Sequence, residues 1–553
     1  MKKLLSIIMS IIALFGACSF VGCGSNLVKD DKTINIALNK AGYGVAWMER
    51  IIEKFESLYE DEGYKVNLLP PSAEYKAPGV LTEMRNYTAG DCADLYFVEG
   101  MYVKDAIDPT YGVCVESLND VFNAGAINFD GSIEETKIKD LPSSSMYRYL
   151  NTDMDNQDEY YSFLYYASPT GLVCNTKVLN DYGYTELPRT TDQLFAIYDG
   201  IYKGTNGKAG SKESGVYPVT WAGDNAYGYS YAAFMNQFAS MLGHKGFEDF
   251  FTLDYTKEDI YNGYNAYKDV ERELTATLKD FIHTYDVMYS YVGSPTQRHD
   301  AAHAQLITGK AAFMSDGSYF FNECKANFGD KLGDVRFFPI PMISELGVML
   351  KLDGSGSDRK KCDEILSYLC DCFDSGMNQA QMKDAASEKF PSVTFTDKQI
   401  QRIWEARGTV VQNLQGHAYI IKNSKVKDIA VLFLRMLASK DAAKLMFESC
   451  MPNAYNPVRE TSSKYAFIND VAIHSSQINK SVFLSLQYGV REELRIDMLG
   501  FTTSLLCAEV TGAIGVEKDV SLRDYDKWAK YFYDKIYKNV EKNWVDRAKN
   551  AGY

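Results

Sequence analysis

The chain has 553 residues and a formal net charge of −15, with 46% hydrophobic and 24% charged residues. This length is enough for two or three domains, and the composition is that of a globular protein. The negative charge argues against nucleic acid or an anionic lipid surface as the main binding partner. The chain also holds 40 Tyr, 29 Phe and 5 Trp, which suits a cleft for ligands with apolar faces and hydroxyls, or simply a Tyr-rich core.

The first residues have the pattern of a secretory signal peptide. Lys2 and Lys3 form a short basic region, residues 4–15 are almost all apolar, and small residues follow. This apolar run is shorter than the roughly 20 residues that a membrane-spanning helix needs. We therefore expect a leader over residues 1–22 and a short polar tether over residues 23–32.

A candidate lipid attachment site ends the leader. The residues Phe20-Val21-Gly22-Cys23 resemble the lipobox of bacterial lipoproteins, in which the Cys becomes the first mature residue and carries diacylglycerol. Phe20 stands where Leu, Val or Ile is usual, and Cys18 is a competing acceptor. We expect lipidation at Cys23 and an anchor on the extracytoplasmic face of the cell membrane; plain cleavage near this point is the alternative.

Strands and helices alternate in the first part of the mature chain. The predicted elements are a strand at 33–38, a glycine-containing loop at 40–44, an amphipathic helix at 45–59, and strands at 64–69 and 93–98. This order indicates a parallel, doubly wound sheet, in which ligands lie beyond the carboxyl ends of the strands. The residues just after the first and third strands are therefore placed at a candidate ligand site.

The rest of the chain also alternates. Strands are predicted at 161–166, 171–175, 311–314 and 335–340, and helices at 192–202, 229–242, 261–285, 300–307, 428–438, 442–450 and 524–547. Residues 351–361 are rich in Gly, Ser and Lys and are expected to form an exposed loop, followed by a mostly helical stretch. Apart from Cys18 and Cys23, an odd number of cysteines is left, without disulfide or metal spacing, so we expect buried thiols.

Six segments carry a resemblance to a known family. They are the 33–38 strand with the Gly42-Tyr43-Gly44 loop, Trp47 and the helix to Glu56; 93–97; 169–179 with 187–194; 309–319; 337–341; and the helix at 428–438. Cys174 and Thr191 replace an aromatic residue and a Trp of the usual pattern, whereas Tyr319 keeps an expected aromatic. In this order behind a lipoprotein leader, the segments resemble the extracellular solute-binding proteins of family 1, the sugar receptors of bacterial ABC importers.

The resemblance implies an α/β, periplasmic-binding-protein-like fold of two lobes. Each lobe is expected to hold a doubly wound, mostly parallel sheet flanked by helices. The expected first lobe comprises 33–167 and about 344–440, with a helical insertion at about 351–416; the second comprises 168–343 and about 441–553, including C-terminal helices. Crossover hinge strands are expected near 167–170 and 339–343.

The resemblance also implies a function without catalysis. A carbohydrate, expected to be an oligosaccharide, binds between the lobes, shifts the chain toward a closed form, and is delivered to the transmembrane permease subunits of an ABC transporter. No cofactor, metal or nucleic acid is expected, and the chain is expected to be a monomer. The sequence names neither the sugar nor the permease, and it assigns no role to the last 90 or so residues.

Candidate ligand contacts lie where strands are expected to end. A sugar needs planar aromatic side chains for its ring faces and fixed carboxylates or amides for its hydroxyls. The candidates are Tyr43, Trp47, Glu99, Trp221, Asp224, Asn225, Tyr227, Asp316 and Tyr319. Three of them also have a structural interpretation: Trp47 and Tyr319 suit a core, and Glu99 suits a helix cap. Trp404 is expected to be structural.

Two other patterns are weaker. His299 and His303 lie at i and i+4, as in zinc proteases, but Asp300 replaces the Glu base and no third ligand is evident. Residues 153–158 have calcium-loop acids but Asp158 in place of the required Gly.

Two rival functions stay open. An exported glycan-degrading enzyme would need two carboxylates in a cleft, and the 73 acidic residues do not exclude such a pair. A receptor for peptides or polyamines would exploit the negative charge, with acids and aromatic faces around a cation.

Overall fold

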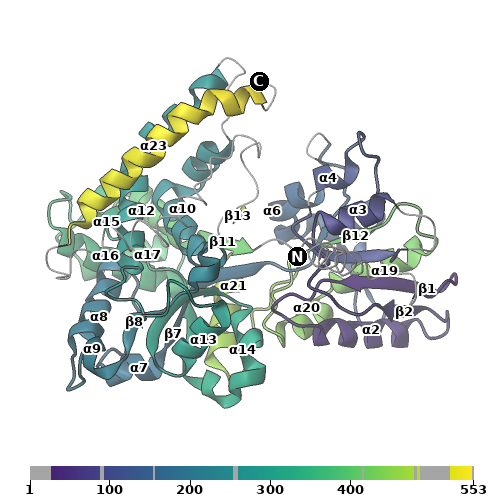
Figure 1. Cartoon of the computed structure of the whole chain (residues 1–553), viewed down its shortest axis with the longest axis horizontal. Coiled ribbons are helices and arrows are strands. Elements are labelled where there is room, and N and C mark those ends of the chain that lie inside the picture. Colours follow the sequence, from purple (N-terminus) through teal and green to yellow (C-terminus); the bar gives the residue numbers. More distant parts are fainter. Residues whose placement is uncertain are drawn as a thin grey trace, which may run out of the picture. The chain divides into compact units, whose positions relative to one another are not determined.

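The computed structural model describes residues 27–86, 92–101, 103–153, 156–252, 259–413, 416–478, 483–485 and 523–550 (Figure 1). The chain forms two compact units. Unit 1 holds the residues up to Tyr166 with 415–448 and 453–456, and unit 2 holds 167–414, 449–452 and the residues from Pro457 onward. None of the helices in these ranges is both long and apolar enough to cross a membrane. The leader and Cys23 lie outside the described residues, so lipidation stays a prediction.

Unit 1 is built on a five-stranded sheet in the order β2-β1-β3-β12-β6. The strands are β1 (Thr33–Leu38), β2 (Lys65–Leu68), β3 (Leu95–Glu99), β6 (Phe163–Leu164) and β12 (Gly416–Ile420). β2 and β3 run parallel to β1, whereas β12 runs antiparallel to both β3 and β6. β1, β3 and β6 therefore end at the edge of the sheet where β12 begins.

Helices cover the faces of this sheet, and β1 is therefore buried along its whole length. They are α2 (Ala46–Leu58), α3 (Gly79–Arg85), α4 (Val103–Ile107), α5 (Asn119–Phe122), α6 (Pro142–Asn151), α19 (Lys427–Leu437) and α20 (Lys440–Phe447). α2 buries Trp47, Met48, Ile51 and Phe55, the helical spacing predicted from the sequence. A hairpin of β4 (Gly125–Ile127) and β5 (Ile133–Lys137) lies beside them.

Unit 2 has a mixed sheet around one long central strand. The strands are β7 (Ser168–Asn175), β8 (Tyr217–Val219), β9 (Ala311–Gly317), β10 (Val335–Phe338), β11 (Val410–Asn413) and β13 (Phe483–Ser485). β7 pairs antiparallel with β9, β10 and β11, and only the β8–β9 and β11–β13 pairs are parallel among the described residues. The expectation of a mostly parallel sheet is wrong in this detail, because the strands that flank β7 return in the opposite direction.

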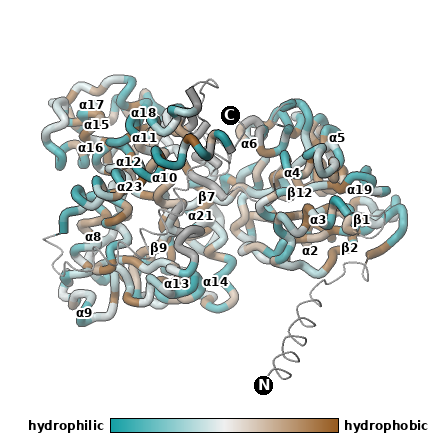
Figure 2. The backbone as a smooth tube through the Cα atoms, turned by 45° about the horizontal axis from the view of Figure 1, so that its top comes forward, coloured by the Kyte–Doolittle hydropathy of each residue, from teal (hydrophilic) through white to brown (hydrophobic). Residues whose placement is uncertain are grey.

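Helices surround this sheet. They are α7 (Thr176–Asp181), α8 (Thr191–Lys203), α9 (Ser211–Ser214), α10 (Ala226–Thr252), α11 (Ala266–Asp269), α12 (Glu271–Thr284), α13 (His299–Ile307), α14 (Phe320–Phe328), α15 (Glu345–Met349), α16 (Arg359–Asp374), α17 (Gln379–Lys389), α18 (Asp397–Gly408), α21 (Ala466–Ile478) and α23 (Tyr525–Asn550). Figure 2 shows hydrophilic stretches along α16 and α17. The predicted helix at 261–285 is interrupted, because α11 ends at Asp269 and α12 starts at Glu271.

Residues 344–414 belong to unit 2, whereas the sequence assigned them to the first lobe. The helices α16, α17 and α18 share a core with Met241 of α10 and Met342. The Arg402 guanidinium also donates to the backbone oxygen of Met241 at 2.7 Å. Because these contacts join segments far apart in the sequence, helical periodicity alone did not indicate them. The chain passes from unit 1 to unit 2 after Tyr166, as expected for the first hinge, but returns after residue 414 and not near 339–343.

The C-terminal helix α23 packs along α12 in unit 2 (Figure 1). Its buried side chains recur every three or four residues and join the main core of the unit. They are Ala529, Phe532, Tyr533, Ile536, Val540, Trp544 and Ala548. This stripe gives the last described residues a structural role that the sequence left open.

Candidate ligand-binding residues

The strand-end edge of unit 1 gathers three of the candidate residues. Tyr43 and Trp47 follow β1, and Glu99 ends β3. Because the carboxyl ends of parallel strands meet at one edge of a sheet, these residues lie together. Tyr165 and Tyr166, which follow β6, complete the group.

The aromatic rings of this edge form one packed cluster. The Trp47 ring stacks on Tyr165 with centroids 5.7 Å apart and planes at 20°. Tyr43 meets Tyr166 edge to face at 5.3 Å. The Trp47 indole N–H donates to the Gly44 carbonyl oxygen at 3.2 Å, and only 2% of Trp47 is exposed. The cluster is therefore an ordered, buried support for this edge.

Glu99 lies beside these rings. The carboxylate is 3.3 Å from the Lys76 ammonium, and 17% of its side chain is exposed. Burial, followed by the negative charge of Glu99, raises the pKa values of Tyr165 and Tyr166 well above their usual range. Both phenols are therefore neutral and buried, and the partly exposed Glu99 carboxylate is the group of this edge that suits ligand hydroxyls.

Four residues of this edge were missed by the sequence analysis. Tyr165 and Tyr166 were predicted to belong to a strand, and their position before the crossover was the available signal. Asn39 directly follows β1 and is buried; its amide donates to the Tyr75 carbonyl at 3.0 Å, while its Oδ1 has no hydrogen-bond partner in the described part of the chain. Gly416 is also required here, because a Cβ atom would lie 2.1 Å from the Tyr166 ring.

Trp221, the candidate after β8, lies in the core of unit 2. It is 1% exposed, and its ring meets Tyr285 edge to face. The indole N–H donates to Ser290 Oγ at 2.9 Å. In this structure the indole supports the loop and presents no open face.

The rest of that loop is held from a distant segment. The Gln297 amide, which the sequence analysis did not single out, donates to Thr220 Oγ1 at 2.7 Å and to the Trp221 carbonyl at 2.9 Å. Asp224 is exposed. The side chains of Asn225 and Tyr227 lie outside what the structure describes, so their roles stay predictions.

Asp316 pairs with a histidine inside unit 2. Its Oδ2 lies 2.8 Å from His303 Nε2, and its Oδ1 accepts from the Gly317 N–H at 2.7 Å. Burial disfavours the imidazolium, but the Asp316 carboxylate outweighs it, so the pKa of His303 lies well above 6.5. Asp316 is thus engaged within the unit. Tyr319 is half-buried, with its ring where a Cβ on Gly317 would stand.

The histidine pair and the cysteines considered in the sequence analysis have structural surroundings in unit 2 and in unit 1. Within the described ranges, no three acidic, His or Cys side chains are grouped to hold a metal ion. His303 is occupied by Asp316 instead. The described cysteines after residue 27 are free and buried, and burial raises the pKa of Cys174 and Cys370. Trp404 packs edge to face on Phe373 among the inserted helices, in the structural role expected of it.

No family model and no curated protein matches the sequence of this chain. Solved structures do match its fold. A probable secreted solute-binding lipoprotein from Streptomyces coelicolor is 14% identical, with a TM-score of 0.54 over 92% of this chain and 100% of that chain. The bacterial solute receptor AcbH, which has an exclusive substrate preference for β-D-galactopyranose, is 13% identical, with a TM-score of 0.53 over 94% of this chain and 100% of that chain.

A chitin oligosaccharide binding protein is likewise 13% identical, with a TM-score of 0.51 over 93% of this chain and 99% of that chain. At these identities the similarity concerns fold and not ligand. The match nevertheless runs over nearly the whole length of each chain, across both units. The chain therefore has the two-lobed α/β fold of bacterial solute-binding proteins.

Proposed function

We propose that this chain is the extracytoplasmic substrate-binding lipoprotein of an ABC importer and that its ligand is a carbohydrate. The observation that carries the proposal is the full-length fold similarity to solute-binding proteins. Two of these proteins bind sugars. The binding proteins among these neighbours also favour capture without catalysis.

The strand-end edge of unit 1 supports a sugar in particular. Ordered aromatic rings stand next to the partly exposed Glu99 carboxylate and neutral phenols. A carboxylate accepts hydrogen bonds from the hydroxyls of a pyranose. The rings are buried, so they hold the surroundings of Glu99 in place. We propose Tyr43, Trp47 and Glu99 of unit 1 as contacts or direct supports of the ligand. Asp224 and Tyr319 of unit 2 stay separate candidates for ligand contact.

The leader supports the cellular part of the proposal. A lipid on Cys23 would hold the chain at the outer face of the cell membrane, next to its permease subunits. Labelling with a radioactive or alkyne-tagged fatty acid should mark the chain, and Cys23→Ser should remove the label. Labelling that persists in this variant but disappears with Cys18→Ser would move the anchor to Cys18.

A ligand screen tests the proposed function. The full chain, kept in mild detergent, is heated with mono- and oligosaccharides, polyamines and short peptides, and unfolding is followed by fluorescence. A ligand at 100 times its dissociation constant should stabilise the fold by about 2.7 kcal/mol. A shift with an oligosaccharide, without product after long incubation, is the expected result.

Other outcomes separate the rival functions. A shift only with polyamines or peptides would keep the receptor role and overturn the carbohydrate. Release of shortened sugars, with loss of the stabilisation as substrate is consumed, would overturn the binding-protein proposal in favour of a glycan-degrading enzyme.

A further inference from the structure

An open pocket of about 660 Å³ lies on unit 2 and involves none of the candidate residues described above. Its walls come from the start of α8, the last turns of α12, Arg359 at the start of α16, and the residues that open α23. A volume of this order suits a small molecule. The inserted helices and the C-terminal helix, which the sequence left without a role, therefore help to form a pocket.

One wall is a column of three stacked rings. The His283 ring lies between Phe195, at 3.7 Å between centroids, and Tyr525, at 4.1 Å, and the planes of these two rings are at 21° and 18° to the His283 plane. Burial lowers the pKa of His283 to about 3, so its imidazole is neutral. This wall is uncharged and largely apolar.

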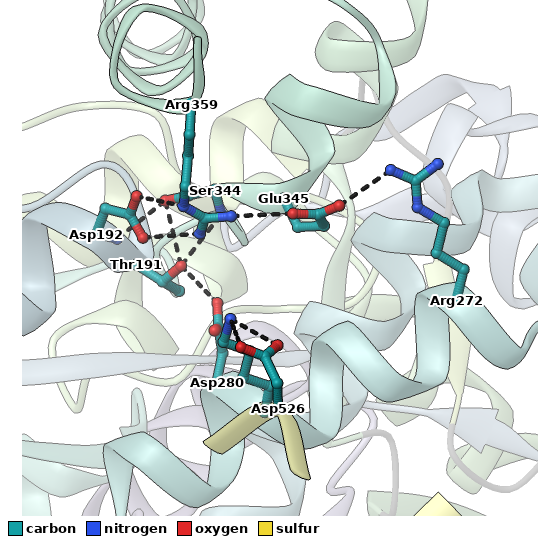
Figure 3. A network of polar contacts seen from close by, with 9 residues as sticks. Thr191, Asp192, Arg272, Asp280, Ser344, Glu345, Arg359 and Asp526 are labelled. Atoms are coloured by element: carbon teal, nitrogen blue, oxygen red, sulfur yellow. Dashed lines mark hydrogen bonds and ion pairs between the residues drawn. The ribbon is translucent and has the colours of Figure 1, made fainter. Parts of the chain in front are cut away.

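The basic residues of the pocket are each engaged by a carboxylate. Figure 3 shows Arg359 with its partners Asp192 and Glu345. Arg359 binds both oxygens of Asp192, at 3.0 and 2.9 Å, and reaches Glu345 at 2.9 Å. The Lys279 ammonium lies 2.8 Å from Asp526. The third, Arg523, forms a buried ion pair with Asp286. These cations are therefore poorly placed to bind an anionic ligand.

Asp280 differs from these carboxylates. It is 3% exposed, and its Oδ2 accepts a hydrogen bond from Thr191 Oγ1 at 2.5 Å. Its Oδ1 accepts no hydrogen bond from the described residues, and none of their cations lies within 4.0 Å of the carboxylate. Burial accordingly raises the pKa of Asp280 to about 7. A buried carboxylate without a partner cation is costly, and this one lines an open pocket.

We propose that this pocket is a second ligand site of the chain, which binds a small organic ammonium ion: a primary amine on a short apolar group. The ammonium donates to Asp280, and the apolar group lies along the Phe195–His283–Tyr525 wall. An ammonium has three N–H donors for a carboxylate and supplies the missing positive charge. A metal ion suits the pocket less, because no group of three potential ligands is present in the described ranges.

Isothermal titration of the full chain at pH 8 with tyramine tests the proposal, with tyrosol, its neutral hydroxyl analogue, as the matched ligand. Tyramine should bind, and tyrosol should bind at least about tenfold more weakly, because it lacks a charge-assisted hydrogen bond. Asp280→Asn should weaken tyramine by a similar factor. The control Asp384→Asn, at an exposed position of α17, should bind as the unmodified chain does.

A second variant should change tyramine affinity in the opposite direction, so the test stays valid if Asp280→Asn folds poorly. Lys279→Met removes a competing cation and frees Asp526, so tyramine should bind several-fold more tightly. The absence of tyramine binding, equal binding of tyrosol, or full binding by Asp280→Asn would overturn the proposal. None of these outcomes depends on the carbohydrate arm of the screen. A polyamine shift in that screen that disappears in Asp280→Asn belongs to this pocket, so the two proposals fail separately.

Discussion

The two units treat the ends of their strands differently. In unit 1, the edge where β1, β3 and β6 end holds packed aromatic rings and Glu99, whose only described ion-pair partner is the half-exposed Lys76. In unit 2, two candidate residues at the edge where β8 and β9 end form hydrogen bonds within the unit. There the Trp221 indole binds Ser290, and Asp316 binds His303.

This difference separates two uses of the same residue types. A buried, fully paired carboxylate such as Asp316 contributes to stability and offers little to a ligand. A partly exposed carboxylate against ordered rings contributes little to stability and is available for binding. The contrast predicts that substitution of a buried, paired residue of the unit 2 edge such as Asp316 changes unfolding, whereas substitution of Glu99 at the unit 1 edge changes ligand affinity.

The largest effect is expected at Asp316. Asp316→Asn removes the nearer counter-charge of the buried His303, leaving Glu323 at 3.9 Å, and should destabilise the chain by about 3 kcal/mol, measured by urea unfolding at pH 6. Carbohydrate affinity, measured well below the unfolding temperature, should change little. A large loss of affinity with unchanged stability would contradict the comparison.

The same pair has a pH signature that serves as a control. The folded pKa of His303 is raised above 6.5, so its contribution to stability is complete below about pH 6.5 and falls as pH rises through the folded value. This fall should be absent in Asp316→Asn. An identical pH dependence in both proteins would remove His303 as its source.

Asp280 sharpens the comparison as a buried carboxylate of unit 2 that lacks a partner cation. Burial raises the pKa of Asp280 from 3.8 to about 7. Ionisation of Asp280 therefore lowers the free energy of unfolding progressively between these two pH values, and the loss is constant above them, at most about 4 kcal/mol. Asp280→Asn should therefore stabilise the chain at pH 8 and have little effect at pH 4. Thermal unfolding at both pH values checks this; equal effects would contradict it.

Gly416→Ala tests the aromatic cluster of unit 1. The new Cβ would overlap the Tyr166 ring, which Tyr43 and Tyr165 hold in place. We expect a destabilisation of about 1–3 kcal/mol, by urea unfolding, together with weaker carbohydrate binding. As a control, Gly376→Asn, at an open position with positive φ, should leave affinity unchanged. Unaltered affinity in Gly416→Ala would exclude the cluster from the site.

Glu99→Gln should change affinity without a matching change in stability. Loss of one charge-assisted hydrogen bond predicts a carbohydrate affinity about tenfold weaker by titration calorimetry. The unfolding temperature should shift little, because the Lys76–Glu99 ion pair is partly exposed. Glu53→Gln, at an exposed position of α2, is the matched control. The reverse pattern, lower stability with full affinity, would make Glu99 structural.

The smallest effect is expected at the surface of unit 1. Arg50 pairs with Glu448, and both side chains are about half exposed. Arg50→Gln should change the free energy of unfolding by less than about 1 kcal/mol and leave carbohydrate binding intact. A larger change would show that exposed ion pairs, and not only buried ones, contribute substantially to the free energy of unfolding.

Local sequence patterns anticipated most elements and part of the site. The apolar run of β1 and the helical spacing of Trp47, Ile51 and Phe55 predicted β1 and α2 closely, because both patterns report burial of a local face. The strand-end rule likewise brought Tyr43, Trp47 and Glu99 to one edge, since it depends only on strand direction.

Tertiary structure alone decided the partners of these residues. The sequence determined which segments form strands and amphipathic helices, a leader pattern, and a two-lobed α/β fold. It did not determine that residues 344–414 pack in unit 2, that the buried Trp221 indole donates a hydrogen bond to Ser290, or that Asp316 is paired with His303. Periodicity describes which face of a segment is buried, whereas these outcomes depend on which distant segment covers that face.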